Sequence, residues 1–254
     1  MRWTRANGRS SAPLRSNGAG DGCLFEREHH RRIAAALEAL DADLLLAHAC
    51  LFGGGTAMAL RHGEYRESVD IDFLTSDLSG YRALRQRLTG PGGINAITRS
   101  QTTLEQLRDM RADQYGVRTL LSVDGVAIKF ELILEARIEF ASPGPGDRLC
   151  GVATLTPLDM ATSKLLANAD RWADDSVLCR DLIDLAMMQP TRKLLQLATA
   201  KAKVAYGDGI DSALLKAIEA LRQRPQHLDH CMAAMRMTTL PKALLWKRIK
   251  ALAP

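Results

Sequence analysis

The sequence has no long hydrophobic run. Its longest apolar stretches, residues 44–52 and 127–134, are much shorter than the roughly 20 residues that a helix needs to cross a bilayer. The first 20 residues carry four arginines, no acidic residue and no apolar segment of the kind that a secretory signal contains. We therefore expect no membrane-spanning helix and no secretory signal, and we predict that residues 1–22 form a disordered basic arm.

Cysteine is scarce, and no two cysteines have the spacing of zinc ligands or of a disulfide framework. The five stand singly along the chain: Cys23, Cys50, Cys150, Cys179 and Cys231. The six histidines show no metal spacing either, and we expect them to be structural or exposed. This pattern fits a protein of the reducing cytoplasm.

The composition is that of an ordinary globular protein, with 46% hydrophobic and 25% charged residues among 254. The net charge of +5 is unevenly distributed, because the chain from Thr191 onward has twelve Lys/Arg against four Asp/Glu and the rest is net negative. A basic C-terminal part beside an acidic centre suggests a phosphate-rich partner. A solvated helix surface is the alternative explanation.

Hydrophobic periodicity predicts the elements of the first half. Residues 25–45 have the spacing of one amphipathic helix, residues 47–52 that of a short strand, and the glycines at 53–55 that of a turn leading into a helix. In the segment 69–74, Val69, Ile71 and Phe73 alternate with Asp70 and Asp72, which predicts a strand with both aspartates on the face opposite the buried residues.

The middle of the sequence predicts a hairpin and then a change of architecture. Residues 117–123 and 126–134 flank an Asp-Gly turn, and Glu131 projects from the second strand on the face opposite Phe130. A helix N-terminus follows at Thr156-Pro157, and everything after it has helical character. We predict an α+β protein with a sheet flanked by helices over 23–153 and an all-helical C-terminal domain over 154–254.

The carboxylates predict a divalent-metal site. Transfer of a nucleotidyl group uses cations that neutralise the triphosphate and activate the attacking hydroxyl, and Mg²⁺ or Mn²⁺ requires hard oxygen ligands. Asp70 and Asp72 on one side of a strand, with Glu131 from a neighbouring strand, meet that requirement. The glycines upstream would let backbone N–H groups approach a phosphate at a helix N-terminus.

The string from Leu51 to Leu60, with Gly-Gly-Gly-Thr at 53–56, followed by Arg-Glu-Ser-Val-Asp-Ile-Asp-Phe at 66–73, resembles the AbiEii/AbiGii toxin family of DNA polymerase β-type nucleotidyltransferases. The resemblance extends to Lys164 and to the segment 180–184. It implies a nucleotidyltransferase fold, with a mixed sheet flanked by helices, and a helical C-terminal domain. It also implies transfer of a nucleotide from an NTP with Mg²⁺, in some members to tRNA, and often a toxin role opposed by an antitoxin. Arg180 stands where lysine is more usual, and Glu131 where aspartate is more typical.

The resemblance assigns a role to each matching residue. The metal ligands are Asp70, Asp72 and Glu131. The catalytic group comprises Asp70, Asp72, Lys164 and Asp181. Nucleotide contacts are expected from Gly54, Gly55, Thr56, Ser68, Lys164 and Asp184.

The pattern of residues 178–185 predicts a helix with a second acidic site, independently of the family resemblance. Its leucines form an apolar stripe, and Asp181 and Asp184 lie along the flank of that stripe, where acids are costly without partners. We expect Arg180 to point toward solvent; a surface pair between Arg180 and Asp184 is the structural alternative.

Three functions remain open. The leading hypothesis is a nucleotidyltransferase acting on RNA or tRNA, in which the basic helical half binds the acceptor. A second keeps the chemistry with a small-molecule acceptor, as in antibiotic-modifying enzymes. A third is a catalytically silent nucleotide-binding interaction module that retains the fold.

Overall fold

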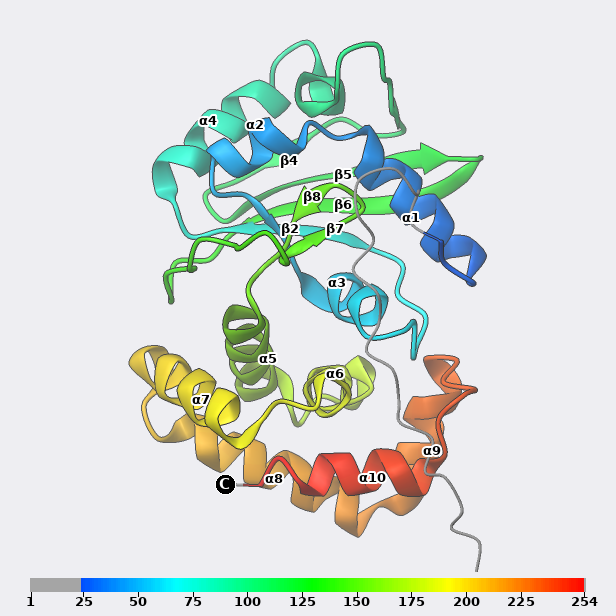
Figure 1. The fold of residues 1–254 in the computed structure, drawn as a ribbon, viewed down its shortest axis with the longest axis vertical. Helices are drawn as coiled ribbons and strands as arrows, with labels where there is room; N and C mark the ends of the chain where they lie inside the picture. The colour runs from blue at the N-terminus through cyan, green and yellow to red at the C-terminus, as the bar shows by residue number, and fades with distance from the viewer. Residues whose placement is uncertain (1–23, 254) are drawn as a thin grey trace, which may run out of the picture.

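The structure is a computed structural model that describes residues 24–253. The predicted basic arm lies outside the described residues. A sheet with covering helices occupies one half of the molecule and a group of helices the other (Figure 1). Across the described part of the chain, no helix combines the length and the hydrophobicity needed to cross a membrane.

A mixed sheet organises the first half. Its spatial order is β1-β2-β6-β5-β3, with β4 paired to β5, and only the β2–β6 pair is parallel. The strands are β1 (Leu51–Phe52), β2 (Ile71–Thr75), β3 (Glu105–Gln106), β4 (Arg111–Ala112), β5 (Gly116–Val123) and β6 (Val126–Leu134). The predicted hairpin is β5–β6; Asp124 and Gly125 at its turn both adopt positive φ, as an Asp-Gly turn allows.

The core of the sheet half is built on aromatic residues of three adjacent strands. Phe73 of β2 lies between Phe52 of β1 and Phe130 of β6, with ring centroids 5.6 and 5.8 Å apart, and all three are fully buried. Because alternate residues of a strand face opposite sides, burying this face leaves Asp72 and Glu131 on the other one.

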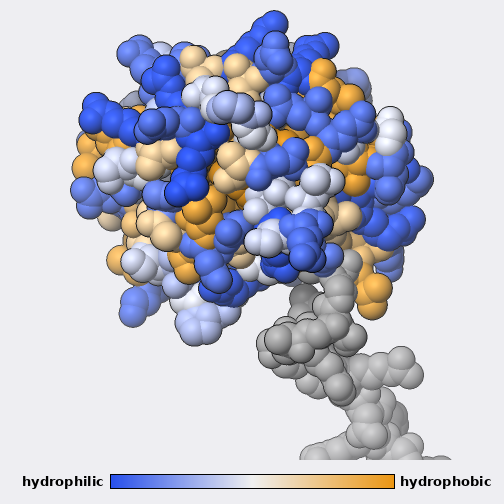
Figure 2. Space-filling model, turned by 90° about the horizontal axis from the view of Figure 1, so that it is seen from above, coloured by the Kyte–Doolittle hydropathy of each residue, from blue (hydrophilic) through white to orange (hydrophobic). Residues whose placement is uncertain are grey.

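Short helices cover the sheet and connect its strands (Figure 1). They are α1 (Glu28–Ala39), α2 (Ala42–Ala47), α3 (Gly54–Arg61), α4 (Leu78–Leu88) and the 3₁₀ turn η1 (Gly93–Ile97). The molecule seen from above is mostly hydrophilic, with hydrophobic side chains scattered between the polar ones (Figure 2).

The predicted helix over 25–45 is wrong in one respect, because two helices replace it. The first ends at Ala39, Leu40 forms a bridge with Thr98, and Asp41 caps the second helix by accepting a hydrogen bond from the N–H of Leu44 at 2.9 Å. The predicted strand over 47–52 is likewise reduced to its last two residues, since the chain turns through a positive φ at Ala49.

A small hairpin of β7 (Arg148–Leu149) and β8 (Val152–Ala153) precedes the second half of the molecule. Every element that the structure describes after this hairpin is a helix, as predicted. Thr156 caps α5 by accepting from the N–H of Asp159, and Pro157 is its first residue. The elements are α5 (Pro157–Arg171), η2 (Asp175–Val177), α6 (Arg180–Met188), α7 (Arg192–Tyr206), α8 (Gly209–Gln223), α9 (Pro225–Ala234) and α10 (Lys242–Lys250).

The two halves have separate cores. One cluster of buried side chains centres on the sheet, and a second on α5, α6 and α8 to α10. Two residues of the sheet half connect them, because buried Ala59 of α3 and Tyr65 after it belong to the helical cluster. We propose the segment between β8 and Pro157 as the domain boundary.

Candidate active site

Three carboxylates of the sheet half line one cavity. Asp72 of β2 and Glu131 of β6 are register partners in the parallel pair, and Asp70 directly precedes β2. All three lie in the wall of a cavity of about 340 Å³, together with Gly54 and Ser68. The structure thus brings together the acids that sequence spacing associates with a metal.

The predicted burial of Val69 is wrong. β2 begins only at Ile71, and Val69 is 47% exposed, so the buried face of this strand consists of Ile71, Phe73 and Thr75. The register of β2 with β6 begins at Ile71, and the Val69 carbonyl oxygen lies 3.1 Å from Nε2 of His29 on α1. Asp70 therefore lies on the connecting segment, directly before β2.

Glu131 already has two cationic partners. Its Oε1 accepts from Nε of Arg118 at 2.9 Å, and its Oε2 lies 2.6 Å from Nζ of Lys129. Among the described residues, the three carboxylates do not bring one oxygen each within 4.8 Å of one another. Glu131 would have to leave one of these cations before joining Asp70 and Asp72 on a common ion.

Asp72 is the electrostatically unfavourable member of the group. Burial, together with the negative charges of Asp70 and Glu131, raises its pKa to about 6, and the nearby Lys164 and Lys129 offset only part of this rise. Negative charge without full compensation, on hard oxygen donors, is what a divalent cation relieves. The residues present therefore fit such an ion.

This pKa predicts a pH-dependent stability in the absence of metal. The folded pKa of about 6 exceeds the unfolded value of 3.8, so the folded state holds the proton more tightly, and stability falls as pH rises from about 4 to 6. Asp72→Asn should be more stable than the parent protein by about 2–3 kcal/mol above pH 6, and equal to it near pH 4. Urea unfolding in EDTA across this range measures the difference, and a pH-independent difference would contradict the assignment.

The glycine turn makes room for charged side chains. Gly54 has φ +68°, and a Cβ on it would overlap the Asp72 carboxylate; a Cβ on Gly55 would overlap the Arg66 guanidinium. Gly53 caps α3 without any side-chain hydrogen bond, so the first-turn N–H groups keep their capacity for an anion. Thr56 is buried and does not line the cavity; its hydroxyl donates to Ser68 at 2.8 Å.

Gly54→Ala is expected to displace Asp72 and to reduce activity by at least tenfold. The matched control is Gly125→Ala, since Gly125 has a similar φ of +74° but open space where its Cβ would lie. Both variants carry a backbone strain of about 1–2 kcal/mol, and only the first disturbs a carboxylate. Equal loss of activity in the two variants, measured at matched folded fraction, would contradict this role.

A buried ionic network adjoins the carboxylates from the helical half. Lys164 of α5 places its Nζ 3.0 Å from Oδ1 of Asp181 and 2.6 Å from Oδ2 of Asp184, both on α6. Arg171, on the same face of α5 as Lys164, donates from Nε to Oδ2 of Asp181 at 2.7 Å. Lys164, Arg171 and Asp181 line the cavity, so the predicted lysine and first acid reach the carboxylates of the sheet.

Asp184 lies behind the cavity instead of in its wall. It is fully buried and accepts two hydrogen bonds from Arg66, Nε to Oδ1 at 2.7 Å and Nη2 to Oδ2 at 3.0 Å, and one from the Tyr65 hydroxyl at 2.6 Å. Arg66 also donates to the Gly55 carbonyl at 3.1 Å. Asp184 thereby joins the glycine turn to α6.

These contacts keep the network charged. Burial alone lowers the pKa of Lys164, but Asp184 and Asp181 outweigh it, and the pKa lies above its ordinary value. Burial alone raises the pKa of Asp184, but Arg66 and Lys164 outweigh it and hold that pKa well below its usual range. Lys164 is therefore a permanent cation in the cavity wall.

The prediction that Arg180 points to solvent is wrong, because Arg180 lines the cavity, and Asp184 pairs with Arg66 and Lys164 in place of Arg180. The sequence pattern assigned no site role to Arg66 or Arg171. A signal for Arg171 exists in the helical spacing that puts it on one face with Lys164. Further lining residues are Met58, Leu74, Lys129, Ile133, Glu135, Arg137, Leu155, Met160, Ser163 and Ala167.

A mixed sheet with paired carboxylates on adjacent parallel strands, a glycine turn at a helix N-terminus and an all-helical second half define the nucleotidyltransferase class. The family model of the nucleotidyl transferase AbiEii toxin of type IV toxin-antitoxin systems matches residues 35–250. The chain belongs to this family.

Two solved structures are similar to the chain. One, from H. pylori and assigned as a nucleotidyltransferase, is 18% identical over 90% of this chain and 99% of its own, with a TM-score of 0.43. JHP933 from Helicobacter pylori is 17% identical over 88% of this chain and 92% of its own, with a TM-score of 0.42. No curated protein matches the chain.

Proposed function

We propose that this protein transfers a nucleotidyl group from an NTP to a hydroxyl of RNA, and that it acts in the cytoplasm as the toxin partner of an antitoxin protein. One observation carries the proposal: a single cavity joins the carboxylates Asp70 and Asp72 to the cations Lys164, Arg171 and Arg180. Both charge types are needed, since the reaction brings together a metal, a triphosphate and an attacking hydroxyl.

The carboxylates provide the metal side of the cavity. Asp70 and Asp72 would hold a divalent ion, with Glu131 joining them on leaving Arg118 or Lys129. When bound, Mg²⁺ or Mn²⁺ supplies neutralisation of the triphosphate charge and activation of the acceptor hydroxyl.

The protein's own cations and N–H groups provide the phosphate side. Gly54 and Gly55 present the uncapped first turn of α3 to the cavity. An ammonium group has three donors, and Lys164 uses two of them on Asp181 and Asp184, which leaves the third for a phosphate oxygen. Arg171, with its side chain 41% exposed, adds a second cation that stabilises the charge of the leaving pyrophosphate.

The two acids of α6 have different roles in this proposal. Asp181 lines the cavity and orients both Lys164 and Arg171. Asp184 is a positioning residue, because its carboxylate is enclosed by protein donors; it fixes Lys164 and Arg66 and does not itself touch the nucleotide.

The reaction is tested with each labelled NTP, Mg²⁺ or Mn²⁺, and a pool of cellular RNA. We expect labelled RNA, and tRNA is the first fraction to examine. Label on a small molecule and none on RNA would favour the antibiotic-modifying alternative. No labelled product of any kind would favour the catalytically silent module.

The basic helical half is tested by RNA binding. Replacing exposed Lys193, Lys247 and Lys250 by alanine should weaken binding and lower the slope of log K against log salt by about one unit for each phosphate that the variant no longer neutralises. The control removes three arginines of the other half, Arg82, Arg85 and Arg87 of α4, and should leave binding unchanged. Equal weakening by both triple variants would contradict the assignment of the acceptor to the helical half.

A further inference from the structure

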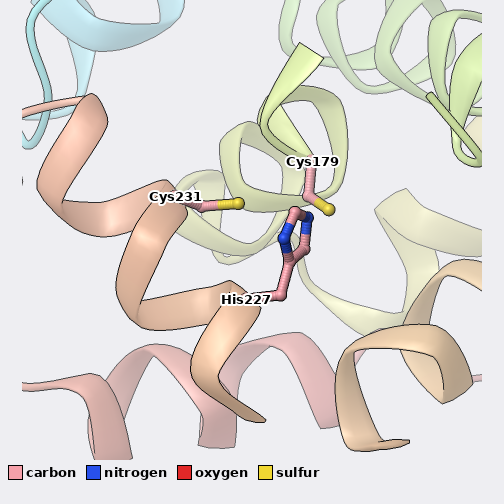
Figure 3. Close-up of side chains that lie close together, drawn as sticks. All are labelled: Cys179, His227 and Cys231. Atoms are coloured by element: carbon pink, nitrogen blue, oxygen red, sulfur yellow. The ribbon is translucent and has the colours of Figure 1, made fainter. Parts of the chain in front are cut away.

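Three side chains outside the cavity come together in the helical half. Cys179, His227 and Cys231 each bring one ligand atom, two Sγ atoms and an imidazole nitrogen, and these atoms all lie within 4.8 Å of one another. Figure 3 shows the imidazole of His227 lying between the two thiols, with the three side chains directed at a common point.

Two unrelated local structures create this convergence. His227 and Cys231 lie one helical turn apart on α9, so their side chains project from the same face. Cys179 is the residue that precedes α6; it and Leu178 both adopt left-handed backbone conformations, with φ of +50° and +57°. Such conformations are unfavourable for residues with a Cβ, and here they aim the Cys179 thiol at α9.

The cluster contains an unsatisfied buried polar atom. Nε2 of His227 is buried without a hydrogen bond, and it lies 3.5 Å from Oδ1 of Asp175. Arg224 holds that carboxylate from the other side, at 2.8 and 3.0 Å. Cys231 is fully buried, whereas Cys179 is partly accessible, so a small ion could enter from the Cys179 side.

We propose that Cys179, His227 and Cys231 form a zinc site. Two thiolates and one imidazole are the soft and borderline donors that zinc prefers over magnesium or calcium, and three such ligands with a solvent molecule make a tetrahedral centre. The oxygen ligands of the carboxylate cavity would then select Mg²⁺, and the sulfur and nitrogen ligands of this cluster would select Zn²⁺, within one chain.

The position of the cluster indicates a structural role. Cys179 lies two residues before Asp181, so an ion on Cys179 would tie the start of α6 to α9. Since α6 carries both acids of the buried ionic network, the site would hold that network in place from outside the cavity. Zinc binding of this kind contributes directly to folding stability.

The spacing of cysteines and histidines indicated no such site. His227 and Cys231 have the i, i+4 spacing of a helical ligand pair, but the third ligand comes from a distant part of the chain and is brought near because α6 and α9 both pack against α8 and α10. A histidine and a cysteine one helical turn apart are the signal that could have been followed.

The site is tested on the full-length protein purified with a reducing agent. We expect about one zinc ion per chain by elemental analysis, and intense thiolate-to-cobalt charge-transfer absorption when Co²⁺ replaces zinc. Cys179→Ser, His227→Ala and Cys231→Ser should each lose the metal and the cobalt spectrum. Two controls should keep both: Cys50→Ser, which removes a buried cysteine elsewhere, and Asp70→Asn with Asp72→Asn, which removes the carboxylate site.

Absence of zinc together with absence of a cobalt–thiolate spectrum in the unaltered protein would overturn the proposal, and this test does not depend on the variants folding. A Cys179–Cys231 disulfide in the protein as purified under the reducing agent, before any metal is removed, found by peptide mass spectrometry, would also overturn it. Zinc that is absent from the Asp70/Asp72 variant but retained in Cys231→Ser would place the metal at the cavity and refute the cluster.

Discussion

Replacing both Asp70 and Asp72 by alanine is expected to reduce nucleotide transfer by roughly 10³-fold or more, because the variant loses the oxygen ligands that we propose for a divalent ion. The estimate corresponds to about 4 kcal/mol of transition-state stabilisation. The measurement is the initial rate of label transfer from NTP to RNA at saturating Mg²⁺.

The control for this variant is Asp109→Ala, which removes an exposed acid at the far edge of the sheet. It should retain the parent rate. The double variant should also remain folded, since Asp72 is a carboxylate whose burial raises its pKa and whose charge disfavours the folded state. A folded double variant that still transfers nucleotide would refute the metal-site assignment.

Asp184→Ala is expected to destabilise the protein by about 3–5 kcal/mol, because it leaves two buried cations without their shared counter-ion. Arg66 and Lys164 are both within 3.0 Å of Asp184, and all three side chains are at least nine-tenths buried. Urea unfolding at neutral pH gives the difference. Glu219→Ala, which opens the exposed pair with Arg222, should leave the unfolding curve unchanged.

Removing the buried charges together should restore most of this stability. A variant carrying Asp184→Leu, Arg66→Met and Lys164→Met should unfold at a denaturant concentration closer to the parent than Asp184→Ala does, since no unpaired charge remains. It should nevertheless be inactive, because Lys164 is gone from the cavity wall. Stability of Asp184→Ala equal to the parent would show that the network is not buried as described.

Local signals in the sequence determined what could be predicted. The β5–β6 hairpin depends on an Asp-Gly turn between alternating residues, and the start of α5 depends on Thr156 and Pro157, all within a few positions of one another. The side of the sheet on which Asp72 and Glu131 lie follows from strand alternation alone, which is why their common cavity could be anticipated.

Tertiary contacts determined what could not be predicted. The break between α1 and α2 coincides with Leu40 bridging to Thr98, and Val69 lies outside the register of β2, with its carbonyl oxygen in contact with His29 of α1. The ion pair between Arg66 and Asp184 joins residues from opposite halves of the chain. These two residues are too far apart in the sequence for helical or strand periodicity to indicate a contact between them. A motif can identify each residue without showing that the two side chains form an ion pair.

The clamp formed by Arg66, Asp184 and the Gly55 carbonyl limits how this fold can be recombined. A chimaera that joins this sheet half to the helical half of a relative must inherit an acid at the position of Asp184, or Arg66 becomes a buried charge without a partner. Exchange of the helices that follow α6 is therefore best made after Met188, where α6 ends and the clamp is already complete.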